Sequence, residues 1–555
     1  MQRVVSWDIN TTSMRCLRQL WTQVMMMCVL IVLLRIETVT AQTGLSRQQL
    51  TAYPYGVHYE IFVRAFCDSN GDGIGDIKGM TSKLDYLQEL GVTGIWLMPI
   101  FKSPSYHKYD VVDYYEIDPE YGTLQDFKEF LREAHKRNIG VTIDFVVNHT
   151  SSKHSWFLSA RNDPQSKYRA FYNWVPASDT TKQWNADWKN GWKTIGDVKY
   201  ECVFWEEMPD LNFDNKAVRD EVMKAATYWV KTIGVDGLRI DAAMHIYGVM
   251  NNKPKADNAK SVAYWAEFSK AIKKVKPSVY LVGEVWARDT LIAPYQKYMS
   301  AFNFDLALAI EHAVQEANTG VVQGYWIGDN KPPTSSAPRI HIIDLLLRAY
   351  SLYRVHNARF LDASFLTNHD QNRIISDFNN DPMKARTAAK ILLTLPGTPY
   401  LYYGEEIGMR GKKPDEYLRE PMLWDKKSAF VGETRWIAPR YNIDSMVVPV
   451  VQQKQDTMSL WHTYKTFIRL RNTIPALAHG DITPVKSFPP NVLVFTRKHK
   501  NQTVLVMHNL SGNTMLVSLG PDAQSFKKTI HISQGSRLMG GGVQLNGGAT
   551  IILEK

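Results

Sequence analysis

Short apolar runs alternate with longer amphipathic stretches from about Tyr53 to Trp424. The short runs are rich in β-branched and aromatic residues, as expected for strands buried on both faces of a parallel sheet. The longer stretches, among them Leu124–Arg137 and Asn215–Ile233, place apolar side chains at helical spacing. The predicted strands are Val57–Val63, Gly94–Ile100, Val141–Val147, Gly237–Ala242, Val279–Val285, Phe302–Asp305, Ala363–Thr367 and Pro399–Tyr403. Eight strands with helical connections predict an α/β protein built on a (β/α)8 barrel.

Two regions depart from this alternation. The connection after the third predicted strand is long, rich in Trp and without clear periodicity. Because βα connections usually run a few residues, we predict an inserted subdomain there, forming one wall of the barrel mouth. The last part of the chain carries short apolar runs separated by Gly, Asn and Ser, which predict a C-terminal antiparallel β-sandwich. The predicted boundaries are 42–149 and 208–425 for the barrel, 150–207 for the inserted subdomain and 426–555 for the sandwich.

The N-terminus has the layout of a signal peptide. Arg15 and Arg18 precede the apolar run Val24–Leu34, and Val39-Thr40-Ala41 then supplies small residues. We predict that residues 1–41 are removed and that the protein is exported, to the periplasm or the extracellular space. An uncleaved anchor is the alternative, but the run is about half of the roughly 20 residues that span a bilayer. No stable membrane insertion is expected after cleavage.

Composition narrows the possible partners. The net charge is +10 and the pI is near 9.1, but the basic residues are dispersed, which indicates a solvated basic surface and not a nucleic-acid site. The 16 Trp and 27 Tyr are consistent with carbohydrate binding, although many must belong to the core. Cys67 and Cys202 remain in the predicted mature chain. Export permits a disulfide between them, and two buried free thiols are the alternative.

Acids close several of the predicted strands. Asp241, Glu284 and Asp370 each follow an apolar run, and parallel strands of a barrel bring such ends together in one mouth. Arg239 and Asp241 stand two residues apart, so they face the same side of a strand. The guanidinium is expected to lower the pKa of Asp241 and keep it ionised, as a nucleophile requires. A purely structural Arg–Asp pair is the alternative.

The other strand ends suit complementary tasks. Glu284 follows an apolar strand, a setting that raises a carboxyl pKa and suits a proton donor. The alternative is a strand-end Glu in a solvated loop. Asp370 can stabilise positive charge in a transition state, and His149 and His369 can donate hydrogen bonds to sugar hydroxyls. Carboxylates gathered in one pocket are the machinery that cleaves glycosidic bonds.

A separate loop has the pattern of a calcium site. Oxygen-bearing side chains alternate with glycines from residue 68 to residue 76, so the chain can curl around a hard cation. The pattern resembles the start of an EF-hand loop but has Gly79 where the twelfth-position Glu would stand. An Asx/Gly-rich turn without an ion is the alternative. The predicted Ca²⁺ ligands are the side chains of Asp68, Asn70, Asp72 and Asp76 and the carbonyl of Ile74.

Five blocks together resemble the sequence regions of glycoside hydrolase family 13, the α-amylase family. They are Asp144–His149, Met208–Asn212, Gly237–His245, Gly283–Trp286 and Phe365–Asp370, and the resemblance runs from about Tyr53 to Lys555. It implies the same three parts as above: a catalytic barrel, a subdomain after the third strand and a C-terminal sandwich. It also implies that Asp241 is the nucleophile, Glu284 the general acid/base and Asp370 the transition-state stabiliser.

The resemblance extends to binding residues. It implies that Arg239, His149, His369 and the segment Tyr106–Tyr109 surround the sugar at the cleaved bond, with Tyr109 as stacking platform and His107 as a hydroxyl contact. Lys108 departs from the family's Gly in that segment. Asp415 and Arg419 resemble a further substrate-binding pair, and His245 resembles a substrate contact. Asn148, oxygens near Asp210 and the His245 carbonyl resemble a second Ca²⁺ site, with Asp187 or Asp197 as candidates to complete it.

The subtype is indicated by two blocks. Met208–Asn212 resembles the group between oligo-1,6-glucosidases and neopullulanases, which includes bacterial α-amylases. His245 resembles amylases, whereas Met244 departs from the Lys of many amylases. We therefore expect a monomeric retaining endo-α-amylase acting on α-glucans such as starch and maltodextrins. An α-glucosidase, a neopullulanase or a transglycosylase on the same fold remains open, as do a catalytically inert transporter heavy chain and a starch-binding protein.

Overall fold

The computed structural model describes residues 52–181, 191–247, 254–322, 339–426, 432–443, 445–520 and 523–555. The predicted signal peptide, residues 1–41, lies outside the described residues. Within the described ranges, no helix is both long and apolar enough to cross a membrane.

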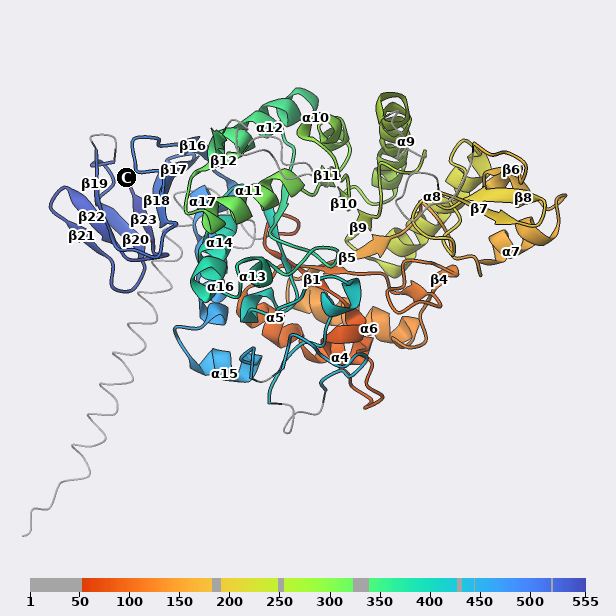
Figure 1. Ribbon diagram of the computed structural model, residues 1–555, viewed down its shortest axis with the longest axis horizontal. Coiled ribbons are helices and arrows are strands. Elements are labelled where there is room, and N and C mark those ends of the chain that lie inside the picture. The colour runs from red at the N-terminus through yellow and green to blue at the C-terminus, as the bar shows by residue number, and fades with distance from the viewer. Residues whose placement is uncertain are drawn as a thin grey trace, which may run out of the picture. The chain divides into compact units, whose positions relative to one another are not determined.

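Eight parallel strands form the central sheet (Figure 1). Their order is β11-β10-β9-β5-β2-β1-β15-β14, and an isolated parallel bridge between Phe302 and Ala363 joins the two ends of this order. The sheet thus closes into the predicted (β/α)8 barrel. Almost every strand residue is buried, because helices cover the outer face and side chains fill the interior. The strands are β1 His58–Ile61, β2 Gly94–Leu97, β5 Gly140–Phe145, β9 Gly237–Ile240, β10 Tyr280–Gly283, β11 Ser300–Ala301, β14 Ala363–Phe365 and β15 Thr398–Tyr402.

The sixth strand differs from its prediction. It consists of Ser300–Ala301, and the predicted residues Phe302–Asp305 instead lead into helix α11, Phe304–Gln315. The reason is local, because the Asn303 side chain accepts a hydrogen bond from the Leu306 amide and caps the helix. The apolar run after Asn303 therefore has helical and not strand periodicity.

Helices lie around the barrel, and several of them begin at a side-chain cap. Thr123 and Asp126 form a capping box at the start of α6, whose Phe127 and Phe130 are buried. Helix α8 continues into a π-helical segment, Tyr228–Ile233, so the single predicted helix has two parts. The principal helices are α4 Ile77–Ser82, α5 Leu84–Leu90, α6 Leu124–Lys136, α8 Lys216–Thr227, α9 Pro254–Val275, α12 Ile342–His356, α14 Pro382–Thr394 and α16 Leu460–Thr473.

The inserted subdomain has its own small sheet. Helix α7 (Ser155–Asn162) precedes strands β6 (Trp174–Pro176), β7 (Trp192–Ile195) and β8 (Val198–Glu201), which pair antiparallel in the order β6-β8-β7. Phe157 of α7 stacks on Trp174 and packs against Tyr200, so aromatic contacts form its core. Isolated bridges from His149 to Asp210 and from Tyr172 to Leu211 join this segment to the barrel.

The C-terminal part is the predicted antiparallel sandwich. One sheet has the order β16-β17-β18-β23-β20 and the other β19-β22-β21, and apolar side chains of both form a common core. The first strand begins at Asp481, and helices α15 (Val450–Gln455), α16 and α17 (Pro475–His479) precede it. The strands are β16 Asp481–Pro484, β17 Val492–His499, β18 Gln502–Asn509, β19 Met515–Ser518, β20 Lys528–Ile532, β21 Arg537–Met539, β22 Gly542–Leu545 and β23 Thr550–Glu554. The thiols of Cys67 and Cys202 are both buried and free.

Candidate active site

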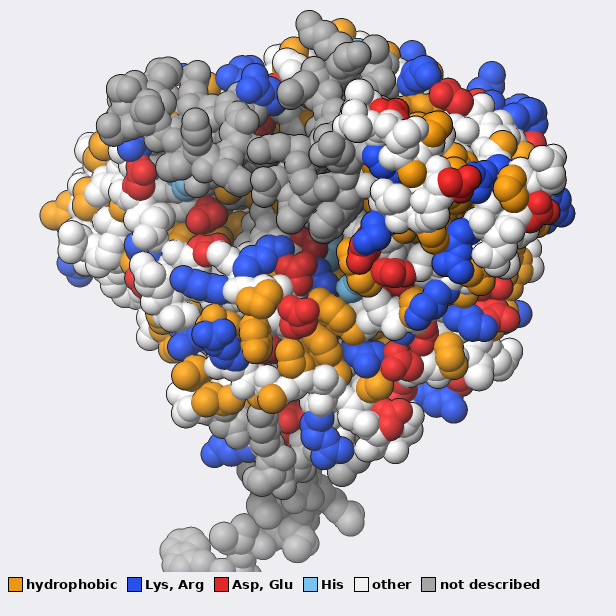
Figure 2. All heavy atoms as spheres, turned by 45° about the vertical axis from the view of Figure 1, so that its right-hand side comes forward, with side chains coloured by type: hydrophobic (Ala, Val, Ile, Leu, Met, Phe, Trp, Pro, Cys, Tyr) orange, Lys and Arg blue, Asp and Glu red, His pale blue; other side chains and the backbone are white. Residues whose placement is uncertain are grey.

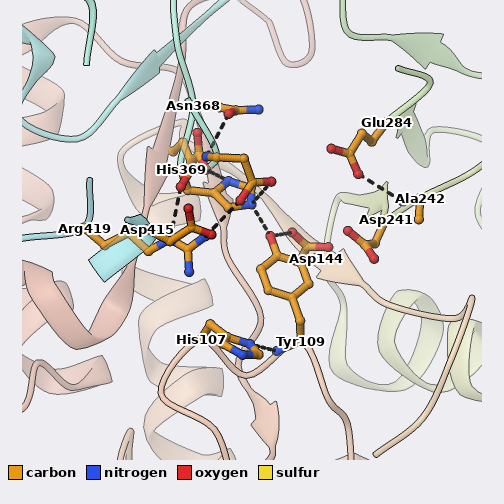
Figure 3. A network of polar contacts seen from close by, with 12 residues as sticks. His107, Tyr109, Asp144, Asp241, Ala242, Glu284, Asn368, His369, Asp415 and Arg419 are labelled. Carbon is orange, nitrogen blue, oxygen red and sulfur yellow. Dashed lines mark hydrogen bonds and ion pairs between the residues drawn. The ribbon is translucent and has the colours of Figure 1, made fainter. Parts of the chain in front are cut away.

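Strand register brings the candidate acids together. Asp144 on β5 is paired with Arg239 on β9, and Arg239 is paired with Val282 on β10. Asp241 and Glu284 follow these paired positions by the same two residues, so they leave neighbouring strands side by side. Figure 3 shows Asp241 and Glu284 on one side of the site, with Asp144 beside the hydroxyl of Tyr109.

One guanidinium contacts all three of these carboxylates. Arg239 Nη1 lies 2.6 Å from Asp241 Oδ1 and 3.0 Å from Asp144 Oδ1, and Nη2 lies 3.1 Å from Glu284 Oε2. The Arg239 side chain is 1% exposed, so water does little to screen these interactions. The predicted contact between Arg239 and Asp241 is therefore present, and Arg239 is shared more widely than the sequence indicated.

Burial governs the protonation of this cluster. It raises the pKa of Glu284, as predicted, and Asp241 and Asp370 raise it further against the opposing charge of Arg239. Burial also raises the pKa of Asp241, although Arg239 opposes the shift. The lowered pKa predicted for Asp241 is thus wrong in direction, because the sequence showed the guanidinium but not the cost of burial. Burial raises the pKa of Asp144 to about 7.

A strained residue follows the candidate nucleophile. Ala242 has φ of 46°, in the left-handed region that residues with a Cβ seldom adopt. Its amide donates a 3.1 Å hydrogen bond to Glu284 Oε2. The turn therefore aims a backbone donor at the candidate acid/base, and such strain is found preferentially at functional sites.

A second buried cation stands opposite. His369 Nδ1 lies 2.5 Å from Glu60 Oε1, and its Nε2 lies 2.6 Å from the Tyr109 hydroxyl and 3.2 Å from Asp370 Oδ2. Burial disfavours its charge, but Asp370 and Glu60 together raise the pKa of His369 to about 10. His369 is therefore an imidazolium at neutral pH.

Asp370 is held in its ionised form. Arg419 Nη2 lies 2.8 Å from Asp370 Oδ1 and 3.2 Å from Asp415 Oδ2, and Lys413 pairs with Asp415. Burial opposes the negative charge, but His369 and Arg419 hold the pKa of Asp370 well below its usual range. Within the predicted pair, Arg419 therefore contacts Asp370 directly, and Asp415 contacts Arg419.

These groups line a cavity of about 650 Å³. The predicted residues Arg239 and His369 lie buried beneath it, and all the other predicted catalytic and substrate-binding residues line it. Burial lowers the pKa values of His149 and His245 to about 4 and that of His107 to about 3, so these three imidazoles are neutral. The lining residues are Tyr106, His107, Tyr109, His149, Phe204, Trp205, Met208, Asp241, Ala242, His245, Glu284, Trp286, Asp370, Lys413, Asp415 and Arg419.

Several lining residues were not predicted individually. Phe204 and Trp205 come from the end of the inserted subdomain, Met208 directly follows it, and Trp286 follows Glu284. Trp205 is 40% exposed, so its ring is accessible at the cavity wall. The signals in the sequence were the Trp-rich composition of the inserted segment and the blocks Met208–Asn212 and Gly283–Trp286. Glu60 and Asp144 were also missed, because a single strand acid does not reveal that it faces a barrel interior.

A smaller polar cavity of about 110 Å³ lies at the junction of barrel and inserted subdomain. Asn148, Asp210 and His245, which were predicted around a second Ca²⁺ site, line it together with Glu201 and Asn173. The Oδ1 atom of Asn148 is buried without a hydrogen-bond partner, and burial and then Glu201 raise the pKa of Asp210. This excess of buried acceptor oxygens fits a hard cation.

Of the two candidates to complete that site, one can be placed and does not line it. Asp197 is exposed in the turn between β7 and β8, and Asp187 lies outside the described residues. Glu201, at the end of β8, is the acid that reaches the cavity. The sequence did not reveal this, because a strand had to return Glu201 from the subdomain to the barrel.

The loop at residues 68–76 is closed by its own amides. Asp68 accepts hydrogen bonds from the amides of Asn70, Gly71 and Gly73, and Asp76 caps α4 through the Gly79 amide. In the described parts of the chain, no three His, Cys, Asp or Glu side chains are grouped so that they could hold a metal ion. This arrangement matches the turn alternative, and Ca²⁺ at Asp68, Asn70, Asp72, Ile74 and Asp76 stays a prediction.

A model of the α-amylase catalytic domain matches residues 60–480. The chain belongs to the α-amylase family, glycoside hydrolase family 13. A second model, of the α-amylase SusG C-terminal domain, matches residues 492–552 of this glycoside hydrolase. The family resemblance carried by the five sequence blocks is thereby confirmed, and the protein is an enzyme of the α-amylase type.

Relatives within the family differ in activity. Alpha-amylase 3 of Dictyoglomus thermophilum is 42% identical over 462 residues, which are 83% of this chain and 85% of that protein. The 4-alpha-glucanotransferase of Thermotoga maritima is 31% identical over 472 residues, which cover 83% and 97%. The structure of the α-amylase from H. orenii aligns with a TM-score of 0.78 at 40% identity, covering 90% of this chain and 99% of that one. Family membership therefore leaves the product of the reaction open.

The buried imidazolium of this glycoside hydrolase is testable. Glu60→Gln removes one of the two carboxylates that contact His369, so the pKa of His369 should fall by about 1–3 units from about 10. Protonated His369 makes its full contribution to the free energy of unfolding below pH 6.5, and this contribution is lost as the pH rises to about 10. In the variant the loss should occur at lower pH. Titration of ¹³C-labelled histidines by NMR measures the pKa, with His508 of the sandwich as the control. An unchanged His369 titration would contradict the role of Glu60.

Proposed function

We propose that this enzyme hydrolyses internal α-1,4-glucosidic bonds of starch, maltodextrins and related α-glucans with retention of anomeric configuration. The observation that carries the proposal is the shared Arg239 contact of Asp241 and Glu284 in a cavity with aromatic walls. Retaining glycosidases hold their two carboxyl groups about 5–5.5 Å apart, whereas inverting ones need about 6.5–9.5 Å to admit a water. Two carboxylates on one guanidinium support the shorter separation.

The protonation pattern supports a division of labour. Asp241 has the shorter contact to Arg239, 2.6 Å against 3.1 Å for Glu284, so it is the better placed of the two to keep its negative charge. Glu284, with its raised pKa, protonates the leaving glucosyl oxygen while Asp241 attacks the anomeric carbon. Deprotonated Glu284 then takes a proton from the water that hydrolyses the covalent intermediate.

The ionised Asp370 stabilises the positive charge that develops on the sugar ring between these steps. His369 and Arg419 hold it in place, and they also keep it ionised. Tyr109 and the neutral imidazoles of His107 and His149 surround the position of the same sugar. A neutral imidazole can both donate and accept a hydrogen bond, which suits sugar hydroxyls.

The higher sequence identity to α-amylases than to a glucanotransferase favours endo-hydrolysis over transfer. The identity is 42% to a protein named an α-amylase and 40% to the solved α-amylase, against 31% to the glucanotransferase. The intact Asp241, Glu284 and Asp370 disfavour an inert transporter heavy chain or a starch-binding protein. Figure 2 shows Lys and Arg mixed with Asp and Glu on the displayed face, as expected for a protein that does not bind nucleic acid.

Two substitutions separate the proposed roles. Glu284→Gln and Asp241→Asn should each lower kcat on starch by about 10²–10⁴-fold while starch binding is retained. The fluoride ion of maltosyl fluoride departs without being protonated, so this substrate does not need the acid. Glu284→Gln should therefore release fluoride from it far faster than Asp241→Asn does. Glu311→Gln is a matched control, because burial raises the pKa of Glu311 to about 7 but it does not line the cavity. Equal rates of fluoride release by the two variants would refute the assignment. If the unmutated protein bound starch but did not hydrolyse it, a starch-binding protein would be favoured.

The product pattern tests the proposed activity. The wild type should cut amylose into a range of maltooligosaccharides early in the reaction, whereas an exo-acting α-glucosidase releases glucose first. Trp205→Ala should raise KM for long maltooligosaccharides more than for maltotriose, because it removes an exposed ring from the cavity wall. Chromatography of products from amylose, pullulan and maltotriose measures both effects. Rapid pullulan cleavage would indicate a neopullulanase, and the formation of chains longer than the substrate from maltotriose would indicate a transglycosylase.

We also propose that Ca²⁺ binds at the smaller polar cavity in a structural role. The residues that would hold it are Asn148, Asp210, Glu201 and the His245 carbonyl, which join the barrel to the inserted subdomain. The ion would neutralise the repulsion between Asp210 and Glu201, and no chemical step passes through it. We further propose that the enzyme is exported and acts as a monomer, in accord with the predicted signal peptide.

Chelation should therefore destabilise the enzyme. An ion at 100 times its Kd contributes about 2.7 kcal/mol to the free energy of unfolding, so EDTA should lower the Tm of the wild type and added Ca²⁺ should restore it. Asp210→Asn combined with Glu201→Gln should abolish this difference and the calorimetric signal of Ca²⁺ binding. Asp220→Asn, an exposed change on α8, is the control. A chelator-dependent Tm that persists in the double variant would locate the ion elsewhere, with the loop at residues 68–76 as the alternative.

A further inference from the structure

Lys108 stands between two cavity residues but does not enter the cavity. His107 and Tyr109 line the cavity, whereas Lys108 is 2% exposed and its ammonium is buried on the other side of the loop. We infer that Lys108 is a positioning residue, which fixes the segment Tyr106–Tyr109 against the substrate through a buried ion-pair tether. The inference rests on the proposed function, because it assumes that this segment contacts the sugar.

The backbone at Lys108 needs such a tether. Lys108 has φ of 65°, in the left-handed region where the Cβ of most residues crowds the following carbonyl. Asn and Asp tolerate this conformation through local hydrogen bonds, but Lys has no short polar side chain to do so. The conformation persists when surrounding contacts over-determine it. At Lys108 these contacts are made by the end of its side chain and by its amide, which donates a 3.2 Å hydrogen bond to Ser105 Oγ.

The tether joins three parts of the chain. Lys108 Nζ lies 3.0 Å from Asp118 Oδ2, 2.6 Å from Glu120 Oε2 and 3.2 Å from the Ser103 carbonyl oxygen. Asp118 follows strand β4 (Asp113–Ile117), and it also accepts a 2.9 Å hydrogen bond from the Ser103 amide. Ser103 follows strand β3 (Phe101–Lys102), so the ammonium and Asp118 together close the base of the loop.

Burial makes these contacts strong. The side chains of Lys108 and Asp118 are each 3% exposed, and that of Glu120 is 38% exposed. A charge pair shielded from water is screened little, and breaking it leaves a buried charge without a partner. Arg64 Nη1 lies 2.7 Å from the same Glu120 oxygen, Oε2, that Lys108 contacts, so both cations hold this carboxylate. The loop is therefore rigidly held from behind.

The front of the same loop meets the candidate catalytic groups. The Tyr109 hydroxyl lies 2.6 Å from His369 Nε2 and 3.1 Å from Asp144 Oδ2 (Figure 3). The Tyr109 carbonyl oxygen lies 3.2 Å from His149 Nε2. A shift of the loop would move Tyr109 and His107 relative to the sugar and would disturb these contacts. Because catalysis depends on geometry held to within a fraction of an ångström, the tether should affect turnover from outside the cavity.

Three substitutions at Lys108 separate the effects of the ion-pair tether, the strained backbone and the positive charge. Lys108→Met removes the ammonium, Lys108→Gly also relieves the backbone strain, and Lys108→Arg keeps a charge. We expect Lys108→Met and Lys108→Gly to lower kcat/KM on maltotriose at least 10-fold and Lys108→Arg to recover most of it. Lys102→Met is the matched control, because Lys102 makes an exposed 2.8 Å pair with Glu116 that also joins β3 to β4, and it should stay within 2-fold of wild type.

Glu120→Gln provides a milder test if the Lys108 variants fold poorly. It weakens the tether but leaves Asp118 in place, so kcat/KM should fall a few-fold with the Tm nearly unchanged. All rates are measured well below the Tm of each variant, with the folded fraction taken from circular dichroism. Wild-type kcat/KM in Lys108→Gly would overturn the inference, because the loop would then need only a permissive backbone. A loss that merely follows the folded fraction would overturn it as well.

Hydrogen–deuterium exchange tests the tether without substrate. The amides of residues 103–110 should exchange faster in Lys108→Met and Lys108→Gly than in the wild type and Lys102→Met, whereas the barrel strands should exchange at equal rates. Unchanged exchange in this loop would overturn the inference. If the wild type hydrolyses no α-glucan, the proposed function fails, while the exchange result still decides whether Lys108 holds the loop.

Discussion

The guanidinium of Arg239 must serve three carboxylates in a place that water hardly reaches. Asp144, Asp241 and Glu284 all contact it, and a single positive charge cannot balance three negative ones in a medium of low dielectric constant. The cluster is therefore stable only if protons supply the missing charge. The raised pKa values of Asp144 and Glu284 follow from this constraint, and a proton held near a glycosidic oxygen is what an acid catalyst requires.

On the opposite side of the cavity, cations outnumber the carboxylate that they contact. Two cations, His369 and Arg419, contact Asp370, so this carboxylate keeps its negative charge. Glu60 beneath the cavity maintains the charge of His369, and Tyr109 connects His369 to Asp144 of the first cluster. One pocket thus holds an acid with a raised pKa and another with a lowered pKa, because the number of nearby cations differs. The residue types at the two positions are nearly the same, and their surroundings decide what each can do.

The sequence was sufficient for what depends on local pattern. The apolar runs located the barrel strands, and the two-residue spacing of Arg239 and Asp241 correctly placed both side chains together. The sequence was not sufficient where a pKa or a site depends on contacts between distant segments. Burial reversed the expected pKa shift of Asp241, and Glu201 reached the polar cavity only because β8 returns to the barrel. The sixth strand was misplaced because the cap at Asn303 converts an apolar run into a helix.

The division between strands and loops also explains how one family supports several reactions. The groups proposed to cleave the bond stand at strand ends, where parallel pairing and burial leave little freedom of position. Other residues of the cavity wall, such as Trp205 and Lys413, stand on connections that can change without disturbing the barrel. Hydrolysis and transfer differ only in whether water or a sugar hydroxyl attacks the intermediate. Residues of the connections line the cavity beside the strand-end acids, and their placement is harder to derive from the sequence than that of the strand ends.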